Sequence, residues 1–122
     1  RPSPSGQWLY VALETGGRNA RINMTSGELQ WIAAPPTGAV SVAPLADDLV
    51  AWGDDSLLTL QRLDAQGAVL ETRGLRTSGF STSLQLLDVD GDGQLDVVVL
   101  NSSGKRSDVI YGPLWERAMP RP

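Results

Sequence analysis

Hydrophobic and polar residues alternate along most of this chain, in short stretches that end at turns rich in Gly, Pro, Asn, Asp or Ser. Alternation with a period of two places successive side chains on opposite faces of a β-strand. The strands that this pattern predicts are Gln7–Glu14, Ala20–Met24, Glu28–Ala33, Ala39–Leu45, Leu49–Trp52, Leu57–Leu63, Ala68–Thr72, Leu84–Leu87, Val97–Leu100 and Ser107–Tyr111. Leu114–Met119 is predicted as a short strand or a helical turn. About ten short strands at this spacing indicate an all-β sandwich, barrel or propeller.

Several of these segments repeat along the chain with a period of about 40 residues. The matching pairs are Leu9–Ala12 with Leu49–Trp52, Gly27 with Gly67, Val42–Leu45 with Leu84–Leu87, and Asp48–Ala51 with Asp96–Val99. The offset between the last two pairs grows by about six residues, and the additional residues lie between Leu87 and Asp96. A period of about 40 to 45 residues is typical of a four-stranded propeller blade. The middle unit therefore resembles the third unit without its loop, and Asp47 and Asp48 are what remains of that loop.

This period divides the chain into two and a half to three antiparallel, propeller-type blades, an incomplete set for a single chain. The predicted parts are a tail at 1–6, a blade-like domain at 7–119 made of a partial blade at 7–36, a second blade at 37–76 and a third at 77–119, and a tail at 120–122. Pro44 places its strand at a sheet edge, because proline cannot donate to a β-ladder. The alternative is a small self-contained β-sandwich that carries one metal-binding hairpin.

The most informative stretch runs from Asp88 to Asp96 and places four carboxylates at alternate positions. Carboxylates this close repel one another unless a cation lies among them. Hard oxygen ligands in a flexible loop suit calcium, which takes six to eight oxygens, better than magnesium. We expect side-chain oxygens from Asp88, Asp90, Asp92 and Asp96 and a main-chain oxygen from Gln94 to bind calcium. A solvated acidic turn is the alternative, since Asp-Gly is common in turns.

The flanking residues exclude an EF-hand, because position twelve of the loop is Val99 instead of a bidentate Glu and both flanks predict strands. The stretch Ser83–Leu100, SLQLLDVDGDGQLDVVVL, resembles the FG-GAP/VCBS repeat, the calcium-loop β-propeller blade of integrin α-chains and many bacterial surface proteins. It covers about a sixth of the chain. The resemblance implies a blade whose first two strands flank the metal loop, and an extracellular binding or adhesion role.

Composition narrows the function further. The chain of 122 residues has a formal net charge of −4 and no basic stripe, which argues against nucleic-acid binding. It contains neither Cys nor His, so a Ser-His-Asp triad, thiol catalysis and the usual zinc sites are excluded, and we expect no enzyme activity. No apolar run approaches about 18 residues, so no membrane span is predicted. Weak calcium modules work outside cells, which favours a secreted, extracellular or periplasmic location.

Four tryptophans are prominent in a chain with only 6% aromatic residues. Trp8 and Trp52 are predicted to pack between blades, and Trp31 and Trp115 are the better candidates for stacking on sugar rings. The expected function is thus a non-catalytic calcium-binding module for protein or carbohydrate binding. The alternatives are a structural subunit of a larger assembly and a non-catalytic fragment of a larger enzyme or surface protein. An incomplete set of blades also predicts completion by a protein partner or by self-association.

Overall fold

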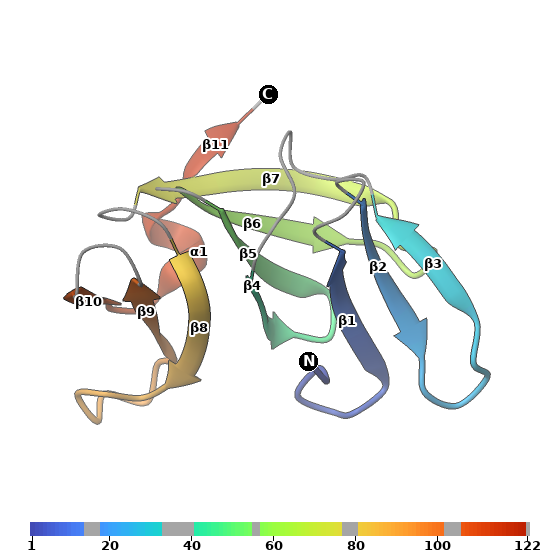
Figure 1. Ribbon diagram of the computed structural model, residues 1–122, viewed down its shortest axis with the longest axis horizontal. Coiled ribbons are helices and arrows are strands. Elements are labelled where there is room, and N and C mark those ends of the chain that lie inside the picture. Colours follow the sequence, from blue (N-terminus) through green and yellow to red (C-terminus); the bar gives the residue numbers. More distant parts are fainter. Residues whose placement is uncertain (14–17, 33–40, 55–56, 77–80, 102–105, 122) are drawn as a thin grey trace.

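The computed structural model describes residues 1–13, 18–32, 41–54, 57–76, 81–101 and 106–121. Over these residues the protein is all-β, with three antiparallel sheets and one short helix (Figure 1). No described sheet closes on itself. The predicted all-β class with antiparallel pairing is therefore confirmed. Stacked open sheets are also compatible with sandwich-like packing, so the assignment to propeller blades stays a prediction.

Sheet 1 contains the first three strands in the order of the chain. They are β1 (Trp8–Leu13), β2 (Arg18–Asn23) and β3 (Leu29–Ile32). The chain start continues this sheet beyond β1, because the Ser3 amide donates to the Trp8 carbonyl and the Tyr10 amide donates to the Arg1 carbonyl. The segment that composition indicates as a tail at 1–6 thus lies against the sheet, with Ser3 buried.

Sheet 2 has five strands in the order β11-β7-β6-β5-β4. They are β4 (Ser41–Ala46), β5 (Leu49–Asp54), β6 (Leu57–Leu63), β7 (Val69–Arg76) and β11 (Met119–Arg121). β4 lies at the edge of the sheet, as Pro44 predicts, and its register with β5 shifts between Pro44 and Ala46. β7 extends beyond its predicted end at Thr72, because its pairing with β6 continues as far as Arg76 opposite Leu57.

Sheet 3 contains β8 (Ser81–Leu87), β9 (Asp96–Asn101) and β10 (Arg106–Ile110), with β9 in the centre. The chain then forms the four-residue helix α1 (Leu114–Arg117) and returns to sheet 2, where β11 pairs with β7 (Figure 1). The segment predicted as a tail at 120–122 therefore contributes Pro120 and Arg121 to a strand. No helix in the described part of the chain is long and apolar enough to cross a membrane.

Sheet 2 is the middle layer, and each of its faces is covered by one of the other sheets. Tyr10 of sheet 1 packs with Val50 and Trp52 of β5, and the Tyr10 and Trp52 rings meet edge to face with centroids 6.2 Å apart. Ala51, between Val50 and Trp52 on β5, points to the opposite face of sheet 2 and packs with Val97 in the hydrophobic core between sheets 2 and 3. A strand that alternates between two covered faces explains why β5 is apolar at nearly every position.

Two hairpin turns share the spacing of the internal repeat. Gly27 and Gly67 have φ angles of +78° and +87°, a left-handed conformation that glycine adopts without steric cost. Asn23 and Asp64 open these turns, and each accepts two backbone N–H bonds through its side-chain Oδ1. Gly27 and Gly67 each donate back to the carbonyl of that first residue, at 2.7 and 3.1 Å. The two turns use similar side-chain and glycine chemistry but differ by one residue in the reach of the glycine bond.

Candidate metal centre

The acidic loop at residues 88–95 connects β8 to β9, so it lies between two antiparallel strands as its flanks predict. Leu87 and Asp96 are partners in the ladder and hold the two ends of the loop together. The tip of the loop is exposed, whereas Asp96 at its end is fully buried. The loop therefore runs from the solvent-exposed residue Asp88 to the buried residue Asp96.

Three of the four predicted carboxylates converge. One oxygen from each of Asp88, Asp90 and Asp96 lies within 4.8 Å of those of the other two, and this is the one such acidic group among the described residues. Asp92 does not belong to this group, and its Oδ1 accepts the Gln94 amide at 2.9 Å. The roles of Asp92 and of the Gln94 carbonyl as ligands therefore stay predictions.

Backbone amides wrap the loop around the Asp88 side chain. Its Oδ1 accepts from Gly91 at 2.8 Å and from Asp92 at 3.2 Å, and its Oδ2 accepts from Gly93 at 2.9 Å. Bonds from the Gly93 and Gly91 amides hold the pKa of the Asp88 carboxyl below its ordinary value. Gly91 and Gly93 have φ angles of +76° and +86° with open space around them, so the backbone conformation, and not crowding, requires glycine at both positions.

Asp96 anchors the loop to a distant part of the chain. Its Oδ2 accepts the Val89 amide at 2.8 Å and its Oδ1 accepts the Gly112 amide, 16 residues further along, at 2.7 Å. A side chain at position 112 would collide with the Leu95 carbonyl, so only glycine fits against the loop there. Buried carboxylates are stable when their oxygens accept such bonds. Asp96 is therefore a structural tie as well as a candidate ligand.

The negative charges in the loop disfavour one another. Partial desolvation, contact with the Asp92 carboxylate and the negative charges of Asp92 and Asp96 raise the pKa of the Asp90 carboxyl. A bound cation reverses this situation, because it favours the ionised form of every carboxylate around it.

The donor set fits a hard cation. All three converging groups are carboxylates, and an ionised carboxylate retains further acceptor sites after it accepts one or two amides. Two oxygens at ~2.4 Å from a shared calcium ion are separated by at most ~4.8 Å, and the three observed oxygens lie within that limit of one another. Asp88, Asp90 and Asp96 are accordingly the residues that would hold the ion. Their arrangement does not distinguish calcium from another oxygen-binding cation.

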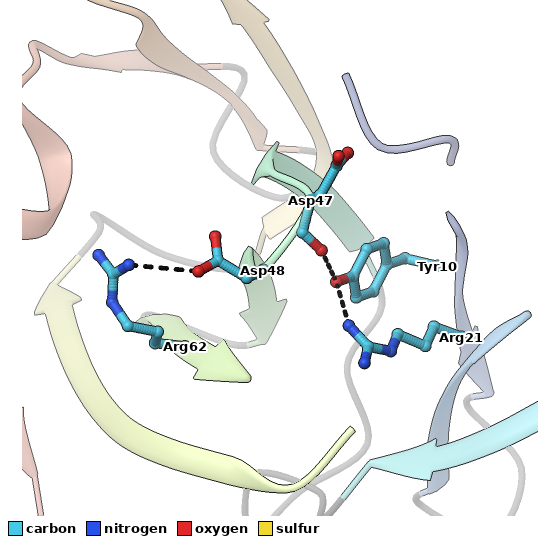
Figure 2. A network of polar contacts seen from close by, with 5 residues as sticks. All are labelled: Tyr10, Arg21, Asp47, Asp48 and Arg62. Carbon is cyan, nitrogen blue, oxygen red and sulfur yellow. Dashed lines mark hydrogen bonds and ion pairs between the residues drawn. The ribbon is translucent and has the colours of Figure 1, made fainter. Parts of the chain in front are cut away.

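The corresponding turn of the middle unit, at Asp47 and Asp48, makes protein contacts (Figure 2). The Tyr10 hydroxyl donates to the Asp47 main-chain carbonyl at 2.6 Å, and the Asp48 carboxylate lies 3.5 Å from the Arg62 guanidinium. The Asp47 carboxylate accepts bonds from Ser5, and these and a bond from Ser3 lower its pKa. The short turn thus connects the edge of sheet 2 to sheet 1.

Arg21 is the main residue at this junction that sequence reasoning missed. It is 1% exposed and donates to the Tyr10 hydroxyl (Figure 2). Its guanidinium also lies 3.8 Å from the centroid of the Trp8 ring and donates to the Gln30 side chain and to the Asp64 carbonyl. An isolated Arg in an alternating strand is indistinguishable from a surface residue. Its position opposite Tyr10 in the ladder, on the buried face, is visible only once the register is known.

Three of the four tryptophans are buried or exposed as predicted, whereas Trp115 is half-buried and packs against the core beside sheet 3. Trp8 and Trp52 are 7% and 1% exposed and belong to the core between sheets 1 and 2, and Trp31 is 48% exposed. Trp115 on α1 has the Arg73 guanidinium 4.1 Å and the Arg62 guanidinium 5.0 Å from its ring centroid. A cation over an aromatic face occupies the surface that a sugar ring would need. Trp115 is therefore a weaker candidate for stacking than Trp31.

A cavity of about 340 Å³ lies beside the acidic loop, between Gln94 and Leu95 on one side and Trp115 and Glu116 on the other. It borders the loop without including the three converging carboxylates.

Comparison of the sequence with protein-family models and with curated proteins gives no match. The resemblance to FG-GAP/VCBS repeats rests on the residues of the loop and its two flanking strands.

Proposed function

We propose that this chain is a non-catalytic, calcium-binding β-repeat module that serves protein or carbohydrate binding outside the cytosol. The observation that carries the proposal is the convergence of Asp88, Asp90 and Asp96 at the turn of a β-hairpin. Three carboxylates held this close, with a raised pKa at one of them, are the arrangement that a divalent cation stabilises.

The residues of the loop explain how binding would order this end of the protein. When bound, the ion would supply the positive charge that offsets the mutual repulsion of the carboxylates. Asp96 links the loop to Gly112, so order in the loop extends to the segment that leads into α1. The cavity beside Gln94 and Trp115 lies between these two elements, and its shape would depend on both. A metal-ordered rim next to a cavity supports a binding role.

The absence of His and Cys from the sequence supports a role without catalysis, because the commonest nucleophile and base pairs cannot be assembled. The carboxylates of the loop would be ligands and not a general acid and base. An extracellular location is part of the proposal, since loops of this chemistry are calcium modules with dissociation constants of about 10⁻⁴ to 10⁻³ M in that setting.

Calorimetric titration and thermal melting test the metal site. Calcium should raise the stability of the wild-type chain, by about 2.7 kcal/mol at a hundredfold excess over the dissociation constant, and EGTA should remove the increment. Asp90→Ala should abolish it. Asp48→Asn removes one carboxylate from an exposed turn outside the loop and should leave it unchanged. A melting temperature that is identical in calcium and in EGTA would contradict the proposal.

Binding to a glycan array and to immobilised extracellular proteins, in calcium and in EGTA, tests the recognition role. The proposal expects a retained ligand that is lost in EGTA and lost by Asp90→Ala. A ligand retained equally by Asp90→Ala would separate recognition from the metal.

The second candidate function is a structural subunit of a larger assembly. It is favoured by the exposed apolar side chains on the sheets at both ends of the stack, which include Leu29, Trp31, Leu87 and Val109.

A further inference from the structure

A second cavity, of about 490 Å³, lies between sheets 1 and 2, and none of the residues of the metal loop lines it. Its volume falls within the roughly 300–1,000 Å³ that small-molecule sites occupy. On the side of sheet 1 its lining is polar, because Arg21 lines it together with Gln7, Asn23 and Gln30. The two sheets otherwise meet through an apolar core, so a polar cavity at their junction requires an explanation.

Arg21 contributes a buried positive charge to this cavity. A guanidinium has five N–H groups. Three of them donate, to Gln30 Oε1 at 2.8 Å, to the Tyr10 hydroxyl at 3.3 Å and to the Asp64 carbonyl at 2.7 Å (Figure 2 shows the Tyr10 bond). All three acceptors are uncharged, and no carboxylate of the described residues forms an ion pair with Arg21. One N–H on each terminal nitrogen therefore has no acceptor in the described part of the chain, and an oxygen atom from outside the chain would stabilise it.

The polar groups of the cavity are held in place by the protein itself. The Arg21 guanidinium lies 3.8 Å from the centroid of the Trp8 ring, and Gln30 Nε2 donates to the Ala65 carbonyl at 3.2 Å. Gly67 packs directly on Gln30, since a Cβ atom at position 67 would lie 2.8 Å from Gln30 Oε1. Side chains that are fixed before binding lose little conformational entropy when a ligand arrives.

The charges around the cavity select the class of ligand. Asp47, Asp48 and Asp64 line it from the turns of sheet 2. Their carboxylates disfavour an anionic ligand, and the buried guanidinium of Arg21 disfavours a cationic one. These three carboxylates do not converge as those of the metal loop do, so they do not form a metal site. A neutral ligand rich in hydroxyl groups suits both signs, because a hydroxyl donates to a carboxylate and accepts from an N–H group.

We propose that this cavity binds a neutral saccharide, whose hydroxyl oxygens accept the two remaining N–H groups of Arg21. Trp8, Leu63 and Ala65 add apolar surface to the lining, which suits the C–H groups on the faces of a sugar ring. The inference names a ligand class and a place for the proposed carbohydrate binding, and it rests on that proposed role. It does not rest on calcium, because the cavity and the metal loop share no residue.

A glycan array that carries neutral, acidic and amino sugars tests the ligand class. The labelled wild-type chain, in EGTA, should retain neutral glycans and should retain neither the acidic nor the amino glycans. A chain that retains no neutral glycan would show that water alone fills the cavity and would overturn the inference. Preference for acidic or amino glycans would overturn it as well.

Two tryptophan substitutions in one turn test the location. Ala65 and Gln66 are adjacent and both exposed, but only Ala65 lines the cavity. Ala65→Trp fills the cavity with an indole ring and should abolish calorimetric binding of the glycan that the array identifies, whereas Gln66→Trp should bind it like the wild type. Binding that survives in Ala65→Trp, or that both variants lose, would overturn the assignment to this cavity.

Arg21→Lys tests the role of the guanidinium. Lysine keeps the charge but has three N–H donors and no planar fork. The affinity for the glycan should fall by about tenfold or more, the equivalent of one hydrogen bond to a charged group. Far-ultraviolet circular dichroism checks that each variant is folded, and Ala65→Trp leaves Arg21 in place, so the location test does not depend on the folding of Arg21→Lys. An unchanged affinity in folded Arg21→Lys would overturn the role of Arg21.

Asp90→Ala separates this inference from the metal site. Glycan binding in EGTA that Asp90→Ala retains and Ala65→Trp loses supports the cavity, whatever calcium does to the melting temperature. Neutral-glycan binding that occurs only in calcium and is lost in Asp90→Ala would assign the ligand to the metal loop and overturn the inference. Failure of the glycan to bind leaves the calcium-dependent melting temperature, the test of the metal site, unaffected.

Discussion

The buried carboxylate of Asp96 provides the sharpest test of how the loop is held. In Asp96→Asn the side chain keeps its shape but exchanges one acceptor oxygen for an NH₂ donor. The oxygens of Asp96 accept the Val89 amide at 2.8 Å and the Gly112 amide at 2.7 Å, so the variant satisfies only one of them. The other amide is left facing a second donor in a buried site, where Asp96 itself is 0% exposed.

The magnitude follows from these two contacts. A hydrogen bond to a charged group contributes about 1.5–3 kcal/mol, and a buried donor without an acceptor costs about 1–3 kcal/mol. The two contributions overlap, so we expect the free energy of unfolding to fall by about 2–4 kcal/mol. That is a large fraction of the roughly 5–15 kcal/mol that stabilises an ordinary domain. For a chain of this size it lowers the melting temperature by roughly 5–20 °C.

The assay is urea unfolding followed by tryptophan fluorescence, in buffer with EGTA so that no metal contributes. Asp92→Asn is the matched control, because its carboxylate accepts the Gln94 amide, two residues along, in the exposed turn and its loss should cost well under about 1 kcal/mol. If the free energy of unfolding of Asp96→Asn in EGTA is within about 0.5 kcal/mol of the wild-type value, the hydrogen bond between Asp96 and Gly112 does not stabilise this hairpin.

Three further predictions concern single groups. Asp90→Asn removes a charge that the neighbouring carboxylates disfavour, so the variant should melt at a higher temperature than the wild type in EGTA and at a lower temperature than the wild type in calcium. A variant less stable than the wild type in both buffers would refute this. Tyr10→Phe should cost about 1–2 kcal/mol through loss of the hydroxyl bond to Asp47. Burial raises the pKa of Tyr10, so the stability that its protonated hydroxyl contributes is complete below the ordinary pKa of 10.0 and is lost as the pH rises through the folded-state pKa. In urea unfolding at alkaline pH, Tyr10→Phe should therefore lose less stability with rising pH than the wild type. An equal loss in both proteins would contradict this prediction. Gly112→Ala should destabilise the chain by about 1–3 kcal/mol, because the added methyl collides with the Leu95 carbonyl, and an unchanged unfolding midpoint would show that the loop yields at no cost.

The sequence by itself determined the local features of this protein. Period-two alternation and turn residues located the strands, because both depend on the chemistry of a few adjacent residues. Pro44 predicted an edge strand for the same reason, and β4 lies at an edge. The spacing of Asp88, Asp90 and Asp96 identified a loop whose carboxylates converge, since a short hairpin loop leaves them little room to separate.

Only the tertiary structure decided which distant residues meet. Arg21 is buried because the register of β1 and β2 places it beside Tyr10 on the face that sheet 2 covers. Asp96 reaches Gly112 because β10 returns antiparallel to β9 and brings the end of that strand next to the loop. Pro120 and Arg121 join a strand because β7 has an edge to receive them. These contacts join residues far apart in the chain. Alternation shows which residues share one face of a strand, but it does not show which face the rest of the protein covers.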